Sequence, residues 1–96
     1  MYNLKYTQEA VDNLNDLKKQ GNINKLKKIK STLEKLSVNP RHPGLHTHKN
    51  QSFTALDGED VFQSYVENNT PSAFRIFWCY GPNKNFITVI AIIPHP

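Results

Sequence analysis

Two residues in the last quarter of the chain have side chains suited to phosphate chemistry. Arg75 is the single charge in the aromatic and apolar stretch S-A-F-R-I-F-W-C-Y at 72–80, and His95 lies between two prolines. A guanidinium stays charged at any working pH and can donate two hydrogen bonds to one phosphate, whereas an imidazole exchanges protons near neutrality. The pair predicts a phosphate clamp beside a proton-transfer group. In the structural alternative, Arg75 would extend to the sheet edge or pair with Glu67.

The segment 39–49, N-P-R-H-P-G-L-H-T-H-K, holds three histidines, an arginine and a lysine. Core packing does not require such a density of cations, and functional residues concentrate in loops, so we predict an exposed functional loop here. His46 and His48 would face one way in an extended chain and could bind zinc together with His42. No fourth ligand stands at a usual zinc spacing, so we predict no metal site.

Cations around a histidine supply what RNA cleavage without a metal needs: a base for the 2′-hydroxyl, a stabiliser for the phosphorane and an acid for the leaving 5′-oxygen. The sequence contains no Gly-rich phosphate loop, no H-E-x-x-H motif and no Ser-His-Asp signature. Cys79 lies inside an apolar stretch and is predicted to be a core residue rather than a nucleophile. The predicted catalytic residues are therefore Arg75, His95, Lys49 and His48, acting without a metal or cofactor.

Basic residues are concentrated in the first half of the chain. Residues 1–50 hold ten Lys and Arg against four Asp and Glu, whereas residues 51–96 hold two against four. A basic half of this kind is expected to meet a polyanion such as RNA; the alternative is a solvated lysine face that keeps a small protein soluble. The predicted RNA-binding residues are Lys25, Lys27, Lys28, Lys30, Arg41 and His46.

The 96 residues, with 38% hydrophobic and 21% charged side chains, suffice for a single folded domain over 1–96. The longest apolar run, at 86–94, is far shorter than the roughly 20 residues of a membrane helix, and the first residues lack the apolar core and cleavage site of a signal peptide. Cys79 has no partner for an internal disulfide. These features predict a cytoplasmic domain.

The elements that must position these residues follow from periodicity and capping signals. Residues 2–6 alternate apolar and polar side chains, as in a half-buried strand. Thr7 and Asn22 are suited to cap two helices, of which the first ends at Gly21 and the second before Pro40. β-Branched and aromatic runs bounded by turn residues then predict three strands. Their predicted bounds are Val61–Glu67, Ser72–Tyr80 and Phe86–Ile93.

The order β-α-α-β-β-β predicts an α+β domain in which an antiparallel or mixed four-stranded sheet packs against an N-terminal helix hairpin. The strand at 86–93 is apolar on both faces. It is therefore predicted to lie inside the sheet, covered on at least one side by the hairpin.

The turn before the last strand sets the predicted register between Arg75 and His95. With Tyr80 opposite Phe86, Arg75 would face about Ala91. His95 would then lie about four residues further on, roughly 13 Å along the strand. The predicted site is thus spread along two neighbouring strands.

With these elements in order, the chain resembles the RelE/ParE toxin superfamily of bacterial toxin–antitoxin modules over nearly its whole length. The resemblance rests on the β-α-α-β-β-β order, the N-P-R-H-P-G-L segment and the A-F-R-I-F-W strand, which is similar to the family's Y-R-(I/V)-x-(Y/F) element. The ribonuclease branch of that family cleaves mRNA in the ribosomal A site without a metal. The resemblance implies an mRNA interferase toxin that inhibits translation, with a cognate antitoxin, the ribosome and mRNA as partners.

In this resemblance Arg75 matches the family's strand arginine, and Lys49 lies where members carry a basic residue after the helix hairpin. His95 matches the terminal histidine of members that end in H-Y, although this chain has H-P. The lysines of the second helix would face ribosomal RNA. Residues 61–67 lack the arginine or lysine that several ribonuclease members have there. The alternatives are a ParE-like gyrase inhibitor and a catalytically inactive binding protein of the same fold.

Overall fold

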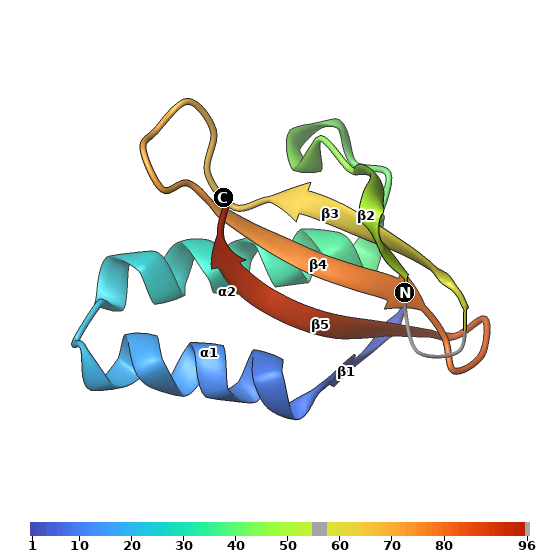
Figure 1. Cartoon of the computed structure of the whole chain (residues 1–96), viewed down its shortest axis with the longest axis horizontal. Helices are drawn as coiled ribbons and strands as arrows, with labels where there is room; N and C mark the ends of the chain where they lie inside the picture. The colour runs from blue at the N-terminus through green and yellow to red at the C-terminus, as the bar shows by residue number, and fades with distance from the viewer. Residues whose placement is uncertain (55–57, 96) are drawn as a thin grey trace.

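The computed structural model describes residues 1–54 and 58–95, in which two helices pack along one face of a five-stranded sheet (Figure 1). The predicted α+β class and helix hairpin are confirmed. No helix within the described ranges is both long and apolar enough to cross a membrane. In chain order the elements are β1 (Asn3–Tyr6), α1 (Gln8–Lys19), α2 (Ile23–Val38), a 3₁₀ turn η1 (Pro43–Leu45), β2 (His48–Thr54), β3 (Asp60–Tyr65), β4 (Phe74–Tyr80) and β5 (Phe86–Pro94).

Both helices begin at the predicted capping residues. The Thr7 hydroxyl oxygen accepts a hydrogen bond from the Ala10 N–H at 3.1 Å, and the Asn22 side chain accepts one from the Lys25 N–H at 3.3 Å. Each cap satisfies an N–H group of the first turn that has no partner inside the helix. Gly21 follows α1 with φ +69°, a left-handed conformation that suits glycine because it has no Cβ. The chain therefore reverses directly into α2.

The strands are ordered β1-β5-β4-β3-β2, with β1 parallel to β5 and the other neighbours antiparallel. β5 lies inside the sheet, as its two apolar faces predicted. The prediction of four strands is wrong, because the edge strand β2 begins at His48, inside the loop predicted at 39–49. This strand begins H-K-N-Q and has no alternating apolar face there, so the period-two pattern of a half-buried strand is absent.

The main core lies between the helices and the sheet. Trp78 is fully buried in it, stacks on Phe62 with 5.0 Å between ring centroids and donates from Nε1 to the Ser64 hydroxyl at 2.8 Å. The Ser64 hydroxyl also shares a hydrogen bond of 2.7 Å with the Thr47 hydroxyl. The indole N–H is therefore satisfied inside the core, as buried polar groups normally are. Other fully buried residues of this cluster are Ala10, Ile29, Leu36, Leu45, Ile76, Ile87, Val89 and Ile92.

The opposite surface of the sheet carries the residues of interest. Successive side chains of a strand point to opposite sides, so Arg75 and Phe77 of β4 lie on the face opposite Trp78. We call this surface the open face. Its apolar part is a small buried cluster of Val61, Phe77 and Ala91. Polar side chains follow at the end where β4 begins and β5 ends.

The register between β4 and β5 differs from the predicted one. Arg75 pairs with Ile93 rather than with Ala91. One residue of this difference arises at the turn between the strands, and the other comes from a β-bulge in β5. His95 consequently lies two residues beyond the partner of Arg75, about 7 Å along the strand, instead of four. The bulge thus brings the two predicted catalytic residues closer together.

Candidate active site

Three nitrogen-bearing side chains gather around the Tyr65 ring at the polar end of the open face. The Arg75 guanidinium carbon lies 3.7 Å from the ring centroid, and the imidazole centroids of His46 and His48 lie 5.1 and 5.8 Å from it. Tyr65 pairs directly with Arg75 across β3 and β4, while the histidines come from the end of η1 and the start of β2. We call these four residues, with the neighbouring Gln63, the Tyr65 cluster.

Neutral groups hold Arg75 in place. Its Nη1 donates to the backbone carbonyl of Glu67 at 2.8 Å and to that of Phe74 at 3.2 Å. The residue is 7% exposed, and its enclosed Nε has no acceptor among the described residues. The alternative pairing with the Glu67 carboxylate is not formed. Within the described ranges no carboxylate pairs with Arg75, so its positive charge remains uncompensated and can attract a phosphate.

His48 forms hydrogen bonds through both ring nitrogens. Nδ1 lies 2.9 Å from the His46 carbonyl oxygen, and Nε2 lies 2.7 Å from the Gln63 side-chain nitrogen. Because a carbonyl oxygen can only accept, Nδ1 carries the proton, and the assigned orientation of the Gln63 amide places a lone pair on Nε2. A lone pair held in a fixed direction is suited to accept a proton.

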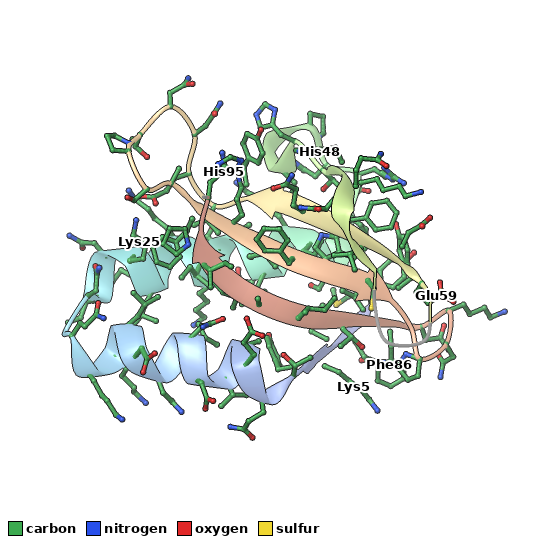
Figure 2. The ribbon with its side chains drawn as sticks, viewed as in Figure 1. Lys5, Lys25, His48, Glu59, Phe86 and His95 are labelled. Atoms are coloured by element: carbon green, nitrogen blue, oxygen red, sulfur yellow. The ribbon has the colours of Figure 1, made fainter. Side chains whose placement is uncertain are left out.

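His95 follows β5 at the same end of the sheet. Its backbone N–H donates to the Ala73 carbonyl at 2.7 Å, and its side chain is exposed. Figure 2 shows His95 just past β5 and His48 at the start of β2, both at this end. Of the predicted catalytic residues, Arg75, His48 and His95 therefore lie at one end of the open face.

Lys49 does not join the Tyr65 cluster. It pairs with Phe62 in the β2–β3 ladder, one residue on from His48, and its Nζ forms an ion pair with Asp60 at 3.2 Å. Neighbouring residues of a strand alternate between faces, so Lys49 and His48 point to opposite sides. The prediction grouped them because it treated this segment as a loop, in which no such alternation holds.

Arg41 and His42, the remaining basic side chains of the segment 39–49, lie outside the Tyr65 cluster. The guanidinium carbon of Arg41 is 5.3 Å from the Phe62 ring centroid, and His42 accepts a hydrogen bond from the Gly44 N–H through Nδ1 at 2.9 Å. In the part of the chain that the structure describes, no three His, Cys, Asp or Glu side chains are arranged to hold a metal ion.

The Glu67 carboxylate connects α2 to the β3–β4 connection. It pairs with Lys25 and, at 3.2 Å, with Lys28, and it accepts a hydrogen bond from the Phe74 N–H at 3.3 Å. Burial alone would raise the pKa of Glu67, but the hydrogen bonds from Lys25, Phe74 and Lys28 together outweigh it and lower the pKa below 4.5. The Lys25 ammonium also lies 4.6 Å from the Phe74 ring centroid, so this lysine mainly supports the fold.

A groove of about 520 Å³ lies beside α2 and the β3–β4 connection. Lys27, Lys28 and Lys35 line it, and Ser31 and Thr70 add hydroxyl groups. Lys30 is exposed but does not line the groove. The lysines that the sequence grouped as one RNA-binding set are thus divided by the structure between an ion pair, a groove and open surface.

Tyr65 and Gln63 belong to the Tyr65 cluster but were not predicted as site residues from the sequence. Tyr65 contributed only to the aromatic content of a predicted strand, and Gln63 is a neutral residue in that strand. One signal was available: Gln63 and Tyr65 are two residues apart, so they share a face. The structure adds that the Gln63 side chain is only 9% exposed. Glutamine is seldom buried to this extent unless its amide forms hydrogen bonds.

No family model matches the chain, and no curated protein matches its sequence. Solved structures do match it. The YoeB dimer from Staphylococcus aureus matches with a TM-score of 0.71 at 16% identity, covering 99% of this chain and 98% of that one. The YoeB/ParE toxin from Agrobacterium tumefaciens matches with a TM-score of 0.73 at 12% identity, covering 100% of both chains. The archaeal RelE–RelB complex from Pyrococcus horikoshii matches with a TM-score of 0.66 at 14% identity, covering 97% and 93%.

At such low identity the likeness lies in the arrangement of helices and strands rather than in the residues they carry. It extends over nearly the full length of both chains in each comparison. The helix hairpin on a mixed sheet, expected from the sequence, is therefore an architecture that this chain shares with known toxins. This chain has the fold of the RelE/ParE toxin superfamily.

Proposed function

We propose that the chain is the toxin of a type II toxin–antitoxin system, a ribosome-dependent mRNA endoribonuclease that needs no metal and inhibits translation. The observation that carries the proposal is the uncompensated Arg75 guanidinium on the open face, with His48 and His95 at the same end of the sheet. The likeness of the fold to solved toxins supports it.

The chemistry assigned to these residues is a transfer of the phosphoryl group from the 5′-oxygen to the 2′-oxygen. His48 accepts the 2′-hydroxyl proton through Nε2 while O2′ forms a bond to phosphorus. The bond between phosphorus and O5′ breaks, and His95 donates a proton to O5′. The products are a 2′,3′-cyclic phosphate and a 5′-hydroxyl. His48 has then gained the proton that His95 has lost, and exchange with water restores both.

Arg75 stabilises the negative charge on the phosphorane oxygens. The Tyr65 ring and two carbonyls already orient its guanidinium, so little rearrangement is needed when the charge develops. Lys49 and Arg41 lie outside the Tyr65 cluster, and we assign them contacts to the RNA backbone rather than proton transfer.

An antitoxin is the proposed protein partner. Chains of this fold occur in a RelE–RelB complex and in a YoeB–YefM toxin–antitoxin complex. The ten basic residues of the first half would attract an acidic or amphipathic antitoxin segment that folds on docking. We assign ribosomal RNA to the exposed lysines of α2.

Primer extension on mRNA incubated with ribosomes and purified protein tests the activity. Arg75→Lys keeps the positive charge but loses the planar guanidinium that can donate two hydrogen bonds to one phosphate. His95→Ala removes the proposed general acid. Each change should lower cleavage by about 100- to 10,000-fold. Lys84→Ala removes an exposed cation in the β4–β5 turn and serves as the matched control. Full cleavage by both Arg75→Lys and His95→Ala would refute the assigned roles.

One observation favours a second candidate, an inactive or gyrase-binding protein of this fold. Arg75 is 7% exposed and uses Nη1 on backbone carbonyls, as a purely structural arginine would. Inhibition of DNA supercoiling by purified gyrase, with no mRNA cleavage on ribosomes, would favour the gyrase-binding form. Antitoxin binding without either activity would favour the inactive form.

A further inference from the structure

Gln63 is one of two buried polar side chains, with Arg75, that have an unpartnered polar atom within the described residues. It is 9% exposed, and its Oε1 is enclosed and has no partner among the described residues. Its Nε2 lies 2.7 Å from Nε2 of His48. An enclosed amide oxygen without a donor costs about 1–3 kcal/mol. A residue that tolerates this cost beside an imidazole is a candidate for a functional role.

The hydrogen bonds of His48 show what that role is. With Nδ1–H donated to the His46 carbonyl, the Nε2 lone pair accepts from the Gln63 amide, which is the arrangement of the neutral ring. If His48 gains a proton on Nε2, two N–H groups would face each other. Rotation of the Gln63 amide by about 180° removes that conflict, because Oε1 then accepts from Nε2–H.

We propose that Gln63 is a positioning residue that holds His48 in both of its protonation states by rotating its side-chain amide. In the neutral state the Gln63 nitrogen bonds to the ring and Oε1 is unpaired. In the protonated state Oε1 bonds to the ring and the nitrogen is unpaired. One amide group lacks a partner in either state, but the ring has a hydrogen-bonded partner in both, so it keeps its place while its charge changes.

The consequence for catalysis rests on the proposed function. The 2′-hydroxyl takes the place of the amide N–H at the Nε2 lone pair and gives its proton to His48. The rotated amide then accepts from the new N–H and holds the cation until exchange with water removes the proton. The proton balance is that of the assigned mechanism, and Gln63 itself neither gains nor loses a proton.

Several charged or titratable groups surround His48. Tyr65 and Gln63 face it from β3, His46 comes from the end of η1, and Arg75 of β4 lies against the Tyr65 ring. On β2 itself, Lys49 points to the opposite side and pairs with Asp60.

Nuclear magnetic resonance of the free protein tests the switch without RNA. Ring ¹⁵N shifts of His48 in the unmodified chain should show the neutral form protonated on Nδ1, and the Gln63 side-chain amide signals should shift with the same midpoint as the His48 titration. A neutral form protonated on Nε2, or amide signals that do not follow His48, would overturn the proposal.

Two variants distinguish a Gln63 amide that rotates from one that bonds only the neutral His48 ring. In Gln63→Met neither state of His48 has its bond. Because the bond to the charged ring is the stronger of the two, the midpoint should stay the same or fall by up to about a unit; if the amide bonded only the neutral ring, its loss would raise the midpoint by about a unit. In Gln63→Glu a carboxylate bonds only the cation, so the midpoint should rise by about 1–3 units. The His42 and His95 midpoints are internal controls. A clear rise in Gln63→Met, or no rise in Gln63→Glu, contradicts the proposal.

Cleavage assays then separate this inference from the proposed function. If the parent cleaves mRNA, the rising limb of its pH–rate profile should move upward in Gln63→Glu by the same number of units as the His48 midpoint. If the parent never cleaves, the proposed function fails, while the magnetic resonance results still decide whether Gln63 follows the charge of His48.

Discussion

Under the proposed function Arg75 and Tyr65 act together, because the Tyr65 ring lies against the guanidinium where an acidic side chain would otherwise pair with it. A carboxylate within ion-pairing distance would compete with a phosphate for the guanidinium, whereas a ring and two carbonyls orient it without cancelling its charge. Residues 61–67 contain no arginine or lysine, so under the proposed function we expect binding of the substrate phosphate to depend strongly on the Arg75 guanidinium.

Tyr65 is predicted to act through its ring and not its hydroxyl. Tyr65→Leu removes the surface that supports the Arg75 guanidinium and should lower cleavage by about 2- to 30-fold, since such a contact is worth about 0.5–2 kcal/mol. Tyr65→Phe keeps the ring and should retain cleavage within about threefold. Rates on programmed ribosomes measure both. Equal losses in Phe and Leu would assign chemistry to the hydroxyl.

At the scale of elements, two side chains attach the helix hairpin to the sheet. Thr7 caps α1, and its hydroxyl also donates to the Ile90 carbonyl of β5 at 2.6 Å. Glu67 attaches α2 to the β3–β4 connection through Lys25 and Lys28. The same connection supplies the carbonyl that holds Arg75, so the position of α2 and the geometry of the site are linked.

Thr7→Ala is expected to lower the free energy of unfolding by about 1–3 kcal/mol. The change removes both the N-cap acceptor and the hydrogen bond to β5. Thr7→Ser keeps the hydroxyl and should lower it by less than about 1 kcal/mol. Urea denaturation followed by Trp78 fluorescence gives both values. Loss of similar size in the two variants would mean that the methyl group, and not the hydroxyl, matters.

Glu67 should make stability depend on pH in the acid range. Its pKa in the folded chain is lowered below 4.5, so it binds protons less readily when folded than when unfolded. The contribution of Glu67 to the free energy of unfolding is therefore complete above a pH of about 4.5, and it is lost as the pH falls through the pKa of the folded state. Glu67→Gln should be less stable than the parent by about 1–3 kcal/mol at pH 7.

The difference between the parent and Glu67→Gln should shrink when both are denatured below pH of about 4. Denaturant midpoints measured from pH 3 to pH 7 test this. A gap of constant size across that range would show that the loss comes from packing and not from the charge of the carboxylate.

At the scale of the whole molecule, the residues that the proposed function assigns to RNA lie on both sides of the sheet. The open face carries the Tyr65 cluster, while the exposed lysines of α2 lie with the helices on the other side. Under the proposed function, the ribosome would contact α2 while mRNA reaches the open face. Affinity for the ribosome would then depend on α2, and the cleavage step on the open face.

This separation predicts different effects of salt and substitution. Lys27→Ala with Lys30→Ala should weaken ribosome binding and reduce the slope of log affinity against log salt by about 1–2, since each contact to a phosphate releases close to one counterion. Lys18→Ala with Lys19→Ala removes the same charge from the last turn of α1 and is the matched control. Equal effects in the two double variants would indicate attraction by net charge alone.

Local sequence determined the helices and most strands of this protein. The caps at Thr7 and Asn22 and the turn at Gly21 act within a few residues. The β-branched and aromatic runs of β4 and β5 indicate strands, and the two apolar faces of β5 indicate a place inside the sheet, so these elements were predictable from the chain itself. The sequence also singled out Arg75, His48 and His95, because charged or titratable side chains at apolar or crowded positions need an explanation.

Only the tertiary structure decided which of these residues meet. The edge strand β2 has no apolar face at its start to reveal it, yet its pairing with β3 sets His48 beside Gln63 and turns Lys49 away. The bulge in β5 shifts the register of Arg75 and His95, and no local pattern specifies a bulge. Contacts between strands depend on long-range pairing, and the sequence of one strand does not encode where its neighbour will place a side chain.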